Sequence, residues 1–127
     1  MRRVTALIAS AFSLLIAPSA SAQADYPNRA ITMVVPFAAG GGVDSAARLL
    51  AKQLGTNLNV PVIVENKPGA NGSVGGKFVQ LAAADGQTLL FPASTQALVK
   101  QVMATPPYDP LTDFAPVALV GSAPLMM

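Results

Sequence analysis

The hydrophobic positions of the chain repeat one arrangement three times: a short apolar run, a loop rich in glycine or proline, and a helical stripe. The runs at 31–35, 62–65 and 88–91 consist mainly of β-branched and other aliphatic residues, which is typical of buried strands. After the first run, which ends at Pro36, apolar residues recur at helical spacing at Val43, Ala46, Ala47, Leu50, Ala51 and Leu54. We expect Gly55 to end this helix. The repeated order predicts an α/β fold with a parallel sheet and crossover helices.

The later part of the chain continues this pattern less regularly. A second helical stripe follows the second run and consists of Val74, Phe78, Leu81 and Ala82. A short helix is expected over 96–103, and the proline-rich segment 105–110 then breaks the regular structure. The apolar residues at 116–120 predict a fourth strand.

The first 22 residues have the pattern of an export signal. Arg2 and Arg3 precede an apolar run from Val4 to Ala17, and the small residues at 20–22 provide a cleavage site. The alternative, a membrane anchor, needs roughly 20 apolar residues to cross a bilayer, and this run is shorter. We therefore predict that residues 1–22 are a cleaved signal peptide and that residues 23–127 form the exported, periplasmic part.

Composition excludes several kinds of chemistry. The chain has no Cys and no His, so disulfides, Cys/His zinc sites and the usual Cys or His nucleophile–base pairs are excluded. No cofactor or metal is expected. The formal net charge of +2 comes from Arg2 and Arg3, so the predicted mature part is neutral. A neutral surface does not favour nucleic acid as a partner.

A run of glycines separates the first predicted strand from the first predicted helix. The N–H groups at the start of a helix attract anions, so Gly40, Gly41 and Gly42 favour a site for a small anionic or polar ligand. A tight turn without a ligand is the simpler alternative. Dinucleotide binding requires G-x-G-x-x-G/A, and Ser45 occupies the last position of that pattern. An α/β enzyme that uses this loop for a nucleotide or phosphate is kept as the alternative function.

The loop at 66–72 contains Pro68-Gly69 and Asn71-Gly72, pairs that favour a rigid turn. It occupies the next strand-to-helix position, so we expect it to face the glycine loop across the carboxyl edge of the sheet. Ser94 and Thr95 follow the third strand and are expected to act as hydrogen-bond donors rather than nucleophiles.

Three residues around the glycine loop have simpler expectations. Phe37 is either a packing residue or a lid on a ligand. Asp44 lies in the first turn of the predicted helix, where a carboxylate complements the helix dipole. Arg48, with Lys52, is expected on the solvated face of that helix.

Several segments occur in one order: 34–41 (VVPFAAGG), 64–72 (VENKPGANG), 85–90 (DGQTLL) and 107–110 (PYDP). In these segments the chain closely resembles the Bug-type substrate-binding receptors of tripartite tricarboxylate transporters, from about Tyr26 to Met127. The resemblance implies a parallel-sheet βαβ lobe of a type II periplasmic-binding-protein fold, incomplete because family members continue into a second lobe. It also implies a non-enzymatic receptor that captures a small carboxylate for membrane permease subunits.

The resemblance also implies which residues hold the ligand. In that family the first two strand-to-helix loops contact the carboxylate through main-chain groups and ordered waters. Carried onto this sequence, the ligand-binding residues are Phe37, Ala39, Gly40, Gly41, Ala70, Asn71 and Gly72, with Ser94 and Thr95 as further candidates. Gly42, which lengthens the glycine run, and Gln87, which stands where an aromatic residue is common, depart from the family pattern.

The export signal predicts the N-terminus of the mature protein. N-terminal sequencing of material recovered outside the cytoplasm should begin at Gln23, because cleavage follows the small residues at 20–22. A protein that stays in the cytosol and begins at Met1 would contradict the signal peptide.

Overall fold

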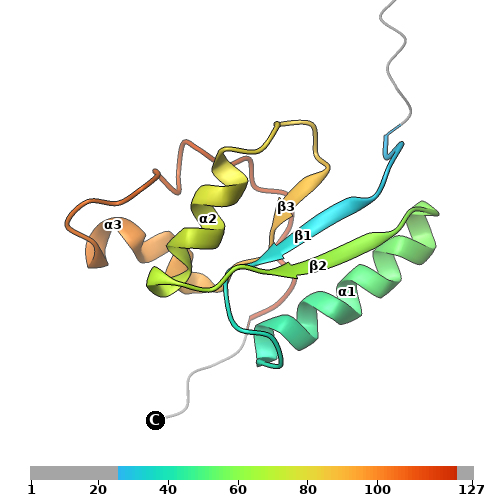
Figure 1. Cartoon of the computed structure of the whole chain (residues 1–127), viewed down its shortest axis with the longest axis horizontal. Coiled ribbons are helices and arrows are strands. Elements are labelled where there is room, and N and C mark those ends of the chain that lie inside the picture. Colours follow the sequence, from blue (N-terminus) through green and yellow to red (C-terminus); the bar gives the residue numbers. More distant parts are fainter. Residues whose placement is uncertain (1–25, 123–127) are drawn as a thin grey trace, which may run out of the picture.

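The structure, a computed structural model, describes residues 26–122 of the 127-residue chain (Figure 1). The predicted signal peptide lies outside these residues. The elements are β1 (Ile31–Val35), α1 (Gly42–Leu58), β2 (Val62–Asn66), the 3₁₀ helix η1 (Ala70–Gly72), α2 (Ser73–Gln80), β3 (Thr88–Leu90), the 3₁₀ helix η2 (Ser94–Leu98) and α3 (Val99–Val102). The three predicted strands, and the alternation of strand, loop and helix along the chain, are confirmed.

The three strands form one parallel sheet in the order β2-β1-β3. Ile31 is paired with Val62 at one end of the β1–β2 ladder, and Val35 is paired with Asn66 at the other. On the other side, β1 pairs with β3 over a shorter ladder that begins at Thr32 and Thr88. The predicted α/β class and parallel sheet are therefore confirmed.

The central strand β1 is buried on both faces. Met33 and Val34 are successive residues, so their side chains point to opposite faces of the sheet, and both are at most 2% exposed. Helix α1 contacts β1 and β2, whereas α2 contacts β3 and β1. The connection from β1 to β2 and the connection from β2 to β3 run in opposite directions across the sheet, and right-handed connections of this kind place their helices on opposite faces. Each face of β1 is thus covered by a helix.

Helix α1 buries most of its predicted apolar stripe against the sheet. Ala47 packs with Met33 and Val35 at the centre of the core, and Leu50 and Leu54 pack around them. Removing an aliphatic side chain of this size from water stabilises a fold by about 1.5–3 kcal/mol. This packing fixes the direction of α1 and places its first turn at the carboxyl edge of the sheet.

The predicted end of α1 at Gly55 is wrong. The helix continues to Leu58, and the C-cap residue Asn59 adopts the left-handed conformation, with φ 54° and ψ 34°. Asn tolerates this conformation, so it ends a helix in the way that glycine does. Gly55 lies inside the helix, where a Cβ would lie 3.2 Å from the Val60 carbonyl oxygen. Its lack of a side chain lets the chain turn back toward β2.

The predicted buried face of α2 is also wrong. Val74, Phe78 and Leu81 are exposed, and the buried residues of the helix are Ser73, Gly75 and Gly76. A Cβ on Gly75 would lie 2.8 Å from the Cβ of Pro36, which real structures essentially never allow. The helix therefore packs through its small residues because they permit a close approach to the end of β1.

The segment after β3 differs from the expected helix and strand. Residues 96–103 were expected to form a single helix, and the structure has η2 followed by α3, which ends at Val102. Residues 116–120 form no strand and are exposed, with Leu119 at 89%. No described strand pairs with them, so an apolar sequence alone does not produce a strand there. Within residues 26–122, no helix has the length and apolar character to span a membrane.

Exposed apolar surface and two open sheet edges predict self-association of residues 23–127 expressed alone. Leu81 and Leu119 are large and exposed, and in the described sheet β2 and β3 each lack a partner on one side. Sedimentation velocity over a range of concentrations should show association that Leu81→Lys combined with Leu119→Lys reduces. Leu49→Lys, at a similarly exposed position on α1, is the matched control and should have a smaller effect. A monodisperse monomer that melts cooperatively would contradict this prediction.

Candidate functional site

Three loops meet at the carboxyl edge of the sheet. The first loop (36–41) connects β1 to α1, the second loop (67–72) connects β2 to α2 and includes η1, and the third loop (91–93) connects β3 to η2. The Asn66 side-chain amide donates to the Phe37 carbonyl oxygen at 3.1 Å, so the first loop touches the end of β2. A Cβ on Gly72 would lie 3.3 Å from Pro36 Cβ and 3.1 Å from Gln96 Oε1. Gly72 therefore lies between the first loop and η2.

The second loop has an unusual backbone. Four successive residues, Gly69, Ala70, Asn71 and Gly72, have φ values of 133°, 44°, 53° and 90°. Asn71 tolerates this region, but Ala70 disfavours it, and such a position persists only where the surrounding structure holds it. The Gly72 N–H donates to the Gly69 carbonyl oxygen at 2.9 Å, and the Ser73 hydroxyl donates to the Ala70 carbonyl oxygen. The loop is thus fixed by its own hydrogen bonds.

The first loop is held by one side chain of α1. Gly40 has φ 87°, a conformation that glycine adopts without steric cost. Its N–H donates to Asp44 Oδ2 at 2.9 Å. Phe37 packs against the core cluster of Met33, Val35 and Ala47. Of the two roles expected for Phe37, this contact favours the packing residue over the lid on a ligand.

Asp44 lies in the first turn of α1, which begins at Gly42. It is nevertheless buried, with 3% of its surface exposed. Its Oδ2 also accepts from Arg48 Nε at 3.0 Å, and its Oδ1 accepts from Asn66 Nδ2 at 2.9 Å. The hydrogen bond from Arg48, then those from the Gly40 N–H and the Asn66 amide, hold the pKa of the Asp44 carboxyl well below its usual range. This carboxyl is therefore ionised at neutral pH.

Asp44 lies in the first turn of α1 and Arg48 is exposed, as expected, and these contacts add to those expectations. Asp44 does more than complement the helix dipole, and Arg48 does not merely lie on a solvated face, because its guanidinium also donates from Nη2 to Asn66 Oδ1 at 3.1 Å. The spacing of the two charged residues, i and i+4 on one helix, is a sequence signal for an ion pair that our predictions did not include. The role of Asn66 could not be found this way, since it lies on another element.

The described cations near the two loops have partners. Arg48 is paired with Asp44, and Lys67 Nζ lies 3.5 Å from Glu65 Oε2 and 4.1 Å from the centre of the Phe78 ring. Meanwhile the first N–H groups of α1 have no acceptors within the helix, and the N-cap Gly41 provides no side-chain cap. This edge can therefore offer main-chain donors to an anion without a dedicated salt bridge.

The structure places the predicted site residues unequally. Gly72 is buried and Phe37 is half-buried, whereas the exposed members of the set are Ala39, Gly40, Gly41, Ala70, Asn71, Ser94 and Thr95. The N–H groups of Gly40 and Gly72 already have internal acceptors, so they support the loops. Binding by the set as a whole stays a prediction.

Sequence reasoning missed Gln96. Its neighbours Ser94 and Thr95 are exposed, but Gln96 is 6% exposed and lies against Gly72. The Gln96 amide nitrogen donates to the Tyr108 hydroxyl, and burial raises the pKa of that phenol. Gln96 Oε1 is buried and accepts no hydrogen bond from the described residues. No sequence pattern marks it, because its partner Tyr108 lies 12 residues further along the chain, within the proline-rich segment 105–110.

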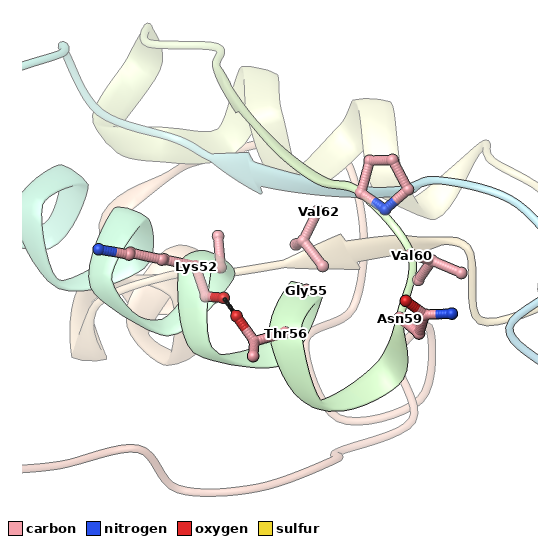
Figure 2. Close-up of a pocket in the computed structure, with 8 residues that line it drawn as sticks. Lys52, Gly55, Thr56, Asn59, Val60 and Val62 are labelled. Atoms are coloured by element: carbon pink, nitrogen blue, oxygen red, sulfur yellow. Dashed lines mark hydrogen bonds between the residues drawn. The ribbon is translucent and has the colours of Figure 1, made fainter.

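A shallow hollow of about 470 Å³ lies at the other end of α1 (Figure 2). Lys52 is its charged residue, and Thr56 Oγ1 donates to the Lys52 carbonyl oxygen at 3.1 Å. A second, more apolar hollow of about 560 Å³ lies among α2, β3 and residues 110–118. The described residues contain no cluster of three or more acidic, Cys or His side chains that could hold a metal. Neither hollow includes the first or second loop.

The arrangement of these loops on a parallel sheet is that of a periplasmic-binding-protein lobe. The chain is similar to the solved structure of the periplasmic binding protein BugD, with 42% identity and a TM-score of 0.68 over 70% of this chain and 30% of that one. It is also similar to MatC from Rhodopseudomonas palustris with bound malate, with 37% identity and a TM-score of 0.69 over 75% of this chain and 33% of that one. The expected fold, an incomplete α/β lobe of this kind, is confirmed.

Sequence comparison defines the family. Residues 46–127 match the family described as "Tripartite tricarboxylate transporter family receptor". Protein BugT of Bordetella pertussis is 43% identical over 104 residues, which cover 80% of this chain and 32% of that protein. The chain therefore belongs to the receptor family of tripartite tricarboxylate transporters, as the resemblance indicated. It spans about a third of the length of the curated relatives it matches.

The close approach of α2 to the first loop predicts the effect of two glycine substitutions. Gly75→Ala should lower the free energy of unfolding by about 1–3 kcal/mol, because its Cβ would overlap Pro36 Cβ and lie 3.0 Å from the Lys67 carbonyl oxygen. Gly42→Ala is the matched control, since a Cβ there meets nothing within 4 Å and alanine favours a helix. Urea denaturation measures both. Equal stability of the two variants would contradict the packing of α2.

Proposed function

We propose that this chain is the first ligand-binding lobe of a periplasmic, non-enzymatic receptor. The receptor binds a small carboxylate and delivers it to the membrane permease subunits of a tripartite tricarboxylate transporter. The observation that carries this proposal is the carboxyl edge of the sheet, where main-chain donors are available and Arg48 and Lys67 have carboxylate partners. Such an edge suits an anion that must be released again, because main-chain hydrogen bonds hold it without a salt bridge.

The ligands of related structures support a carboxylate. MatC was solved with malate, and another Rhodopseudomonas palustris relative, 34% identical with a TM-score of 0.66, was solved with adipate. Each of these ligands carries two carboxylates on a short carbon chain. For the present chain, the exposed first-loop residues Ala39 and Gly41 and the start of α1 are the groups we expect to meet one carboxylate.

A receptor role is favoured over catalysis by the side chains at this edge. Ser94 and Thr95 are exposed hydroxyls, and the sequence contains no His or Cys to act as a partner. Asp44, the buried carboxylate beside the first loop, already accepts three hydrogen bonds. The alternative, an enzyme that uses the first loop for a nucleotide or phosphate, has no comparable support among the relatives.

A periplasmic location is supported by two independent lines. The first 22 residues have the pattern of an export signal. BugD, to which this lobe is similar, is described as a periplasmic binding protein. The family description, a receptor of tripartite tricarboxylate transporters, supports the proposed delivery to permease subunits.

Carboxylate binding is testable by titration followed with amide chemical shifts. Malate and adipate should shift first-loop amides with an affinity of about millimolar or weaker, since one lobe supplies part of a two-lobed site. Gly41→Val should weaken binding about tenfold or more, because the valine side chain would enter the space in front of the loop. The fold should tolerate the change, since a Cβ on Gly41 makes only an ordinary contact of 3.7 Å with the Ala38 carbonyl oxygen.

The control is Thr56→Val, an exposed substitution near the other end of α1, which should leave the affinity unchanged. Adenine and nicotinamide nucleotides should cause no shifts in the same loop. Saturable binding of a nucleotide with no response to carboxylates would favour the enzyme alternative. Unchanged carboxylate affinity in Gly41→Val would return the glycine loop to the role of a turn.

A further inference from the structure

The Asp44 carboxylate joins three separate parts of the chain. Its donors are the N–H of Gly40 in the first loop, the guanidinium of Arg48 on α1, and the side-chain amide of Asn66 at the end of β2. The distances are 2.9, 3.0 and 2.9 Å, and the carboxylate is buried. Charge-assisted hydrogen bonds of this length are stronger than those between neutral groups.

Asn66 is the second half of this connection. Its Nδ2 donates both to Asp44 Oδ1 and to the Phe37 carbonyl oxygen, and its Oδ1 accepts from Arg48. Asn66 is also the last residue of β2, so the second loop begins at the next residue. The Asn66 side chain lies directly before the second loop. It holds the first loop at two points, at Phe37 directly and at Gly40 through Asp44.

We propose that Asp44 and Asn66 are positioning residues that fix the first and second loops relative to each other. Neither residue contacts the ligand. They act by keeping the main-chain groups of the two loops at one spacing, so that both can meet the same carboxylate. The inference rests on the proposed function for its ligand, but the coupling of the loops is measurable without one.

A role in general stability is the competing explanation, and the chain contains a matched control for it. Asp85 accepts from Arg29 Nη2 at 2.7 Å and from the Gln87 N–H at 3.0 Å, so it also joins an arginine and a main-chain donor. It lies just before β3, at the opposite edge of the sheet from the two loops. Asp85→Asn therefore removes the charge and one of the two acceptor oxygens, as Asp44→Asn does, without touching the proposed site.

A side-chain swap tests the pairing itself. Asp44→Asn alone turns an amide toward the Asn66 amide, and Asn66→Asp alone turns a second carboxylate toward Asp44. The double variant restores one donor and one acceptor with the hydrogen bond reversed, and it keeps one carboxylate for Arg48. The Phe37 carbonyl oxygen loses its donor, so we expect partial recovery.

The experiment uses the full chain labelled with ¹⁵N and with malate as the probe. Each single variant should shift amide signals in both loops, at Gly40 and at Asn71, and should weaken malate binding about fivefold or more. The swap should recover a substantial part of both effects. Asp85→Asn should leave the Gly40 and Asn71 signals and the malate affinity unchanged, whatever its effect on the melting temperature.

Several outcomes would overturn the inference. One is a swap whose effect equals the sum of the single variants. Another is a shift confined to Gly40, with the second loop unaffected by Asp44→Asn. If malate fails to bind the unaltered chain, the proposed function fails, and the amide shifts still decide the coupling. If the variants do not fold, hydrogen exchange of the unaltered chain tests the hydrogen bond from the Gly40 N–H to Asp44. A Gly40 amide that exchanges as fast as an exposed loop amide has no fixed acceptor, and this result would overturn the inference.

Discussion

The burial of one strand organises the whole lobe. Strand β1 has a neighbouring strand on each side and a helix on each face, and Ile31, Met33, Val34 and Val35 are almost completely removed from water. Because both faces must be covered, the two helices have to leave the sheet on opposite sides. Because β1 and β2 are parallel neighbours, the first and second loops start from adjacent carboxyl ends and lie close together before any side chain in them makes a contact.

Close packing then determines how near the two loops lie. Pro36 is fully buried and faces the positions of Gly72 and Gly75, so the second loop and the start of α2 rest directly on the end of β1. The four residues of the second loop with positive φ are held in place by the turn that ends at Gly72. Asp44 and Asn66 add hydrogen bonds that connect the first loop to α1 and to the end of β2.

The sequence predicted those features that depend on local pattern. The strands, most of the buried face of α1 and the carboxyl-edge loops follow from the spacing of apolar residues and from the positions of glycine and proline. The face of α2 could not be predicted this way, because hydropathy marks Val74 and Phe78 as core positions and does not register that Gly75 allows close approach. The roles of Gln96 and Asn66 were missed because their partners lie far along the chain. The Asp44–Arg48 ion pair was also missed, although its i, i+4 spacing on one helix is a signal in the sequence.

The pairing of the cations at the carboxyl edge has a consequence for how salt acts on this surface. Mobile ions weaken attraction between separated charges over about 8–10 Å at ordinary salt concentrations, but they act much less on short hydrogen bonds between a main-chain N–H and an oxygen. Arg48 and Lys67 are already occupied by Asp44 and Glu65, so they contribute little long-range attraction. On the proposed function, the share of ligand binding that this edge supplies therefore depends little on ionic strength.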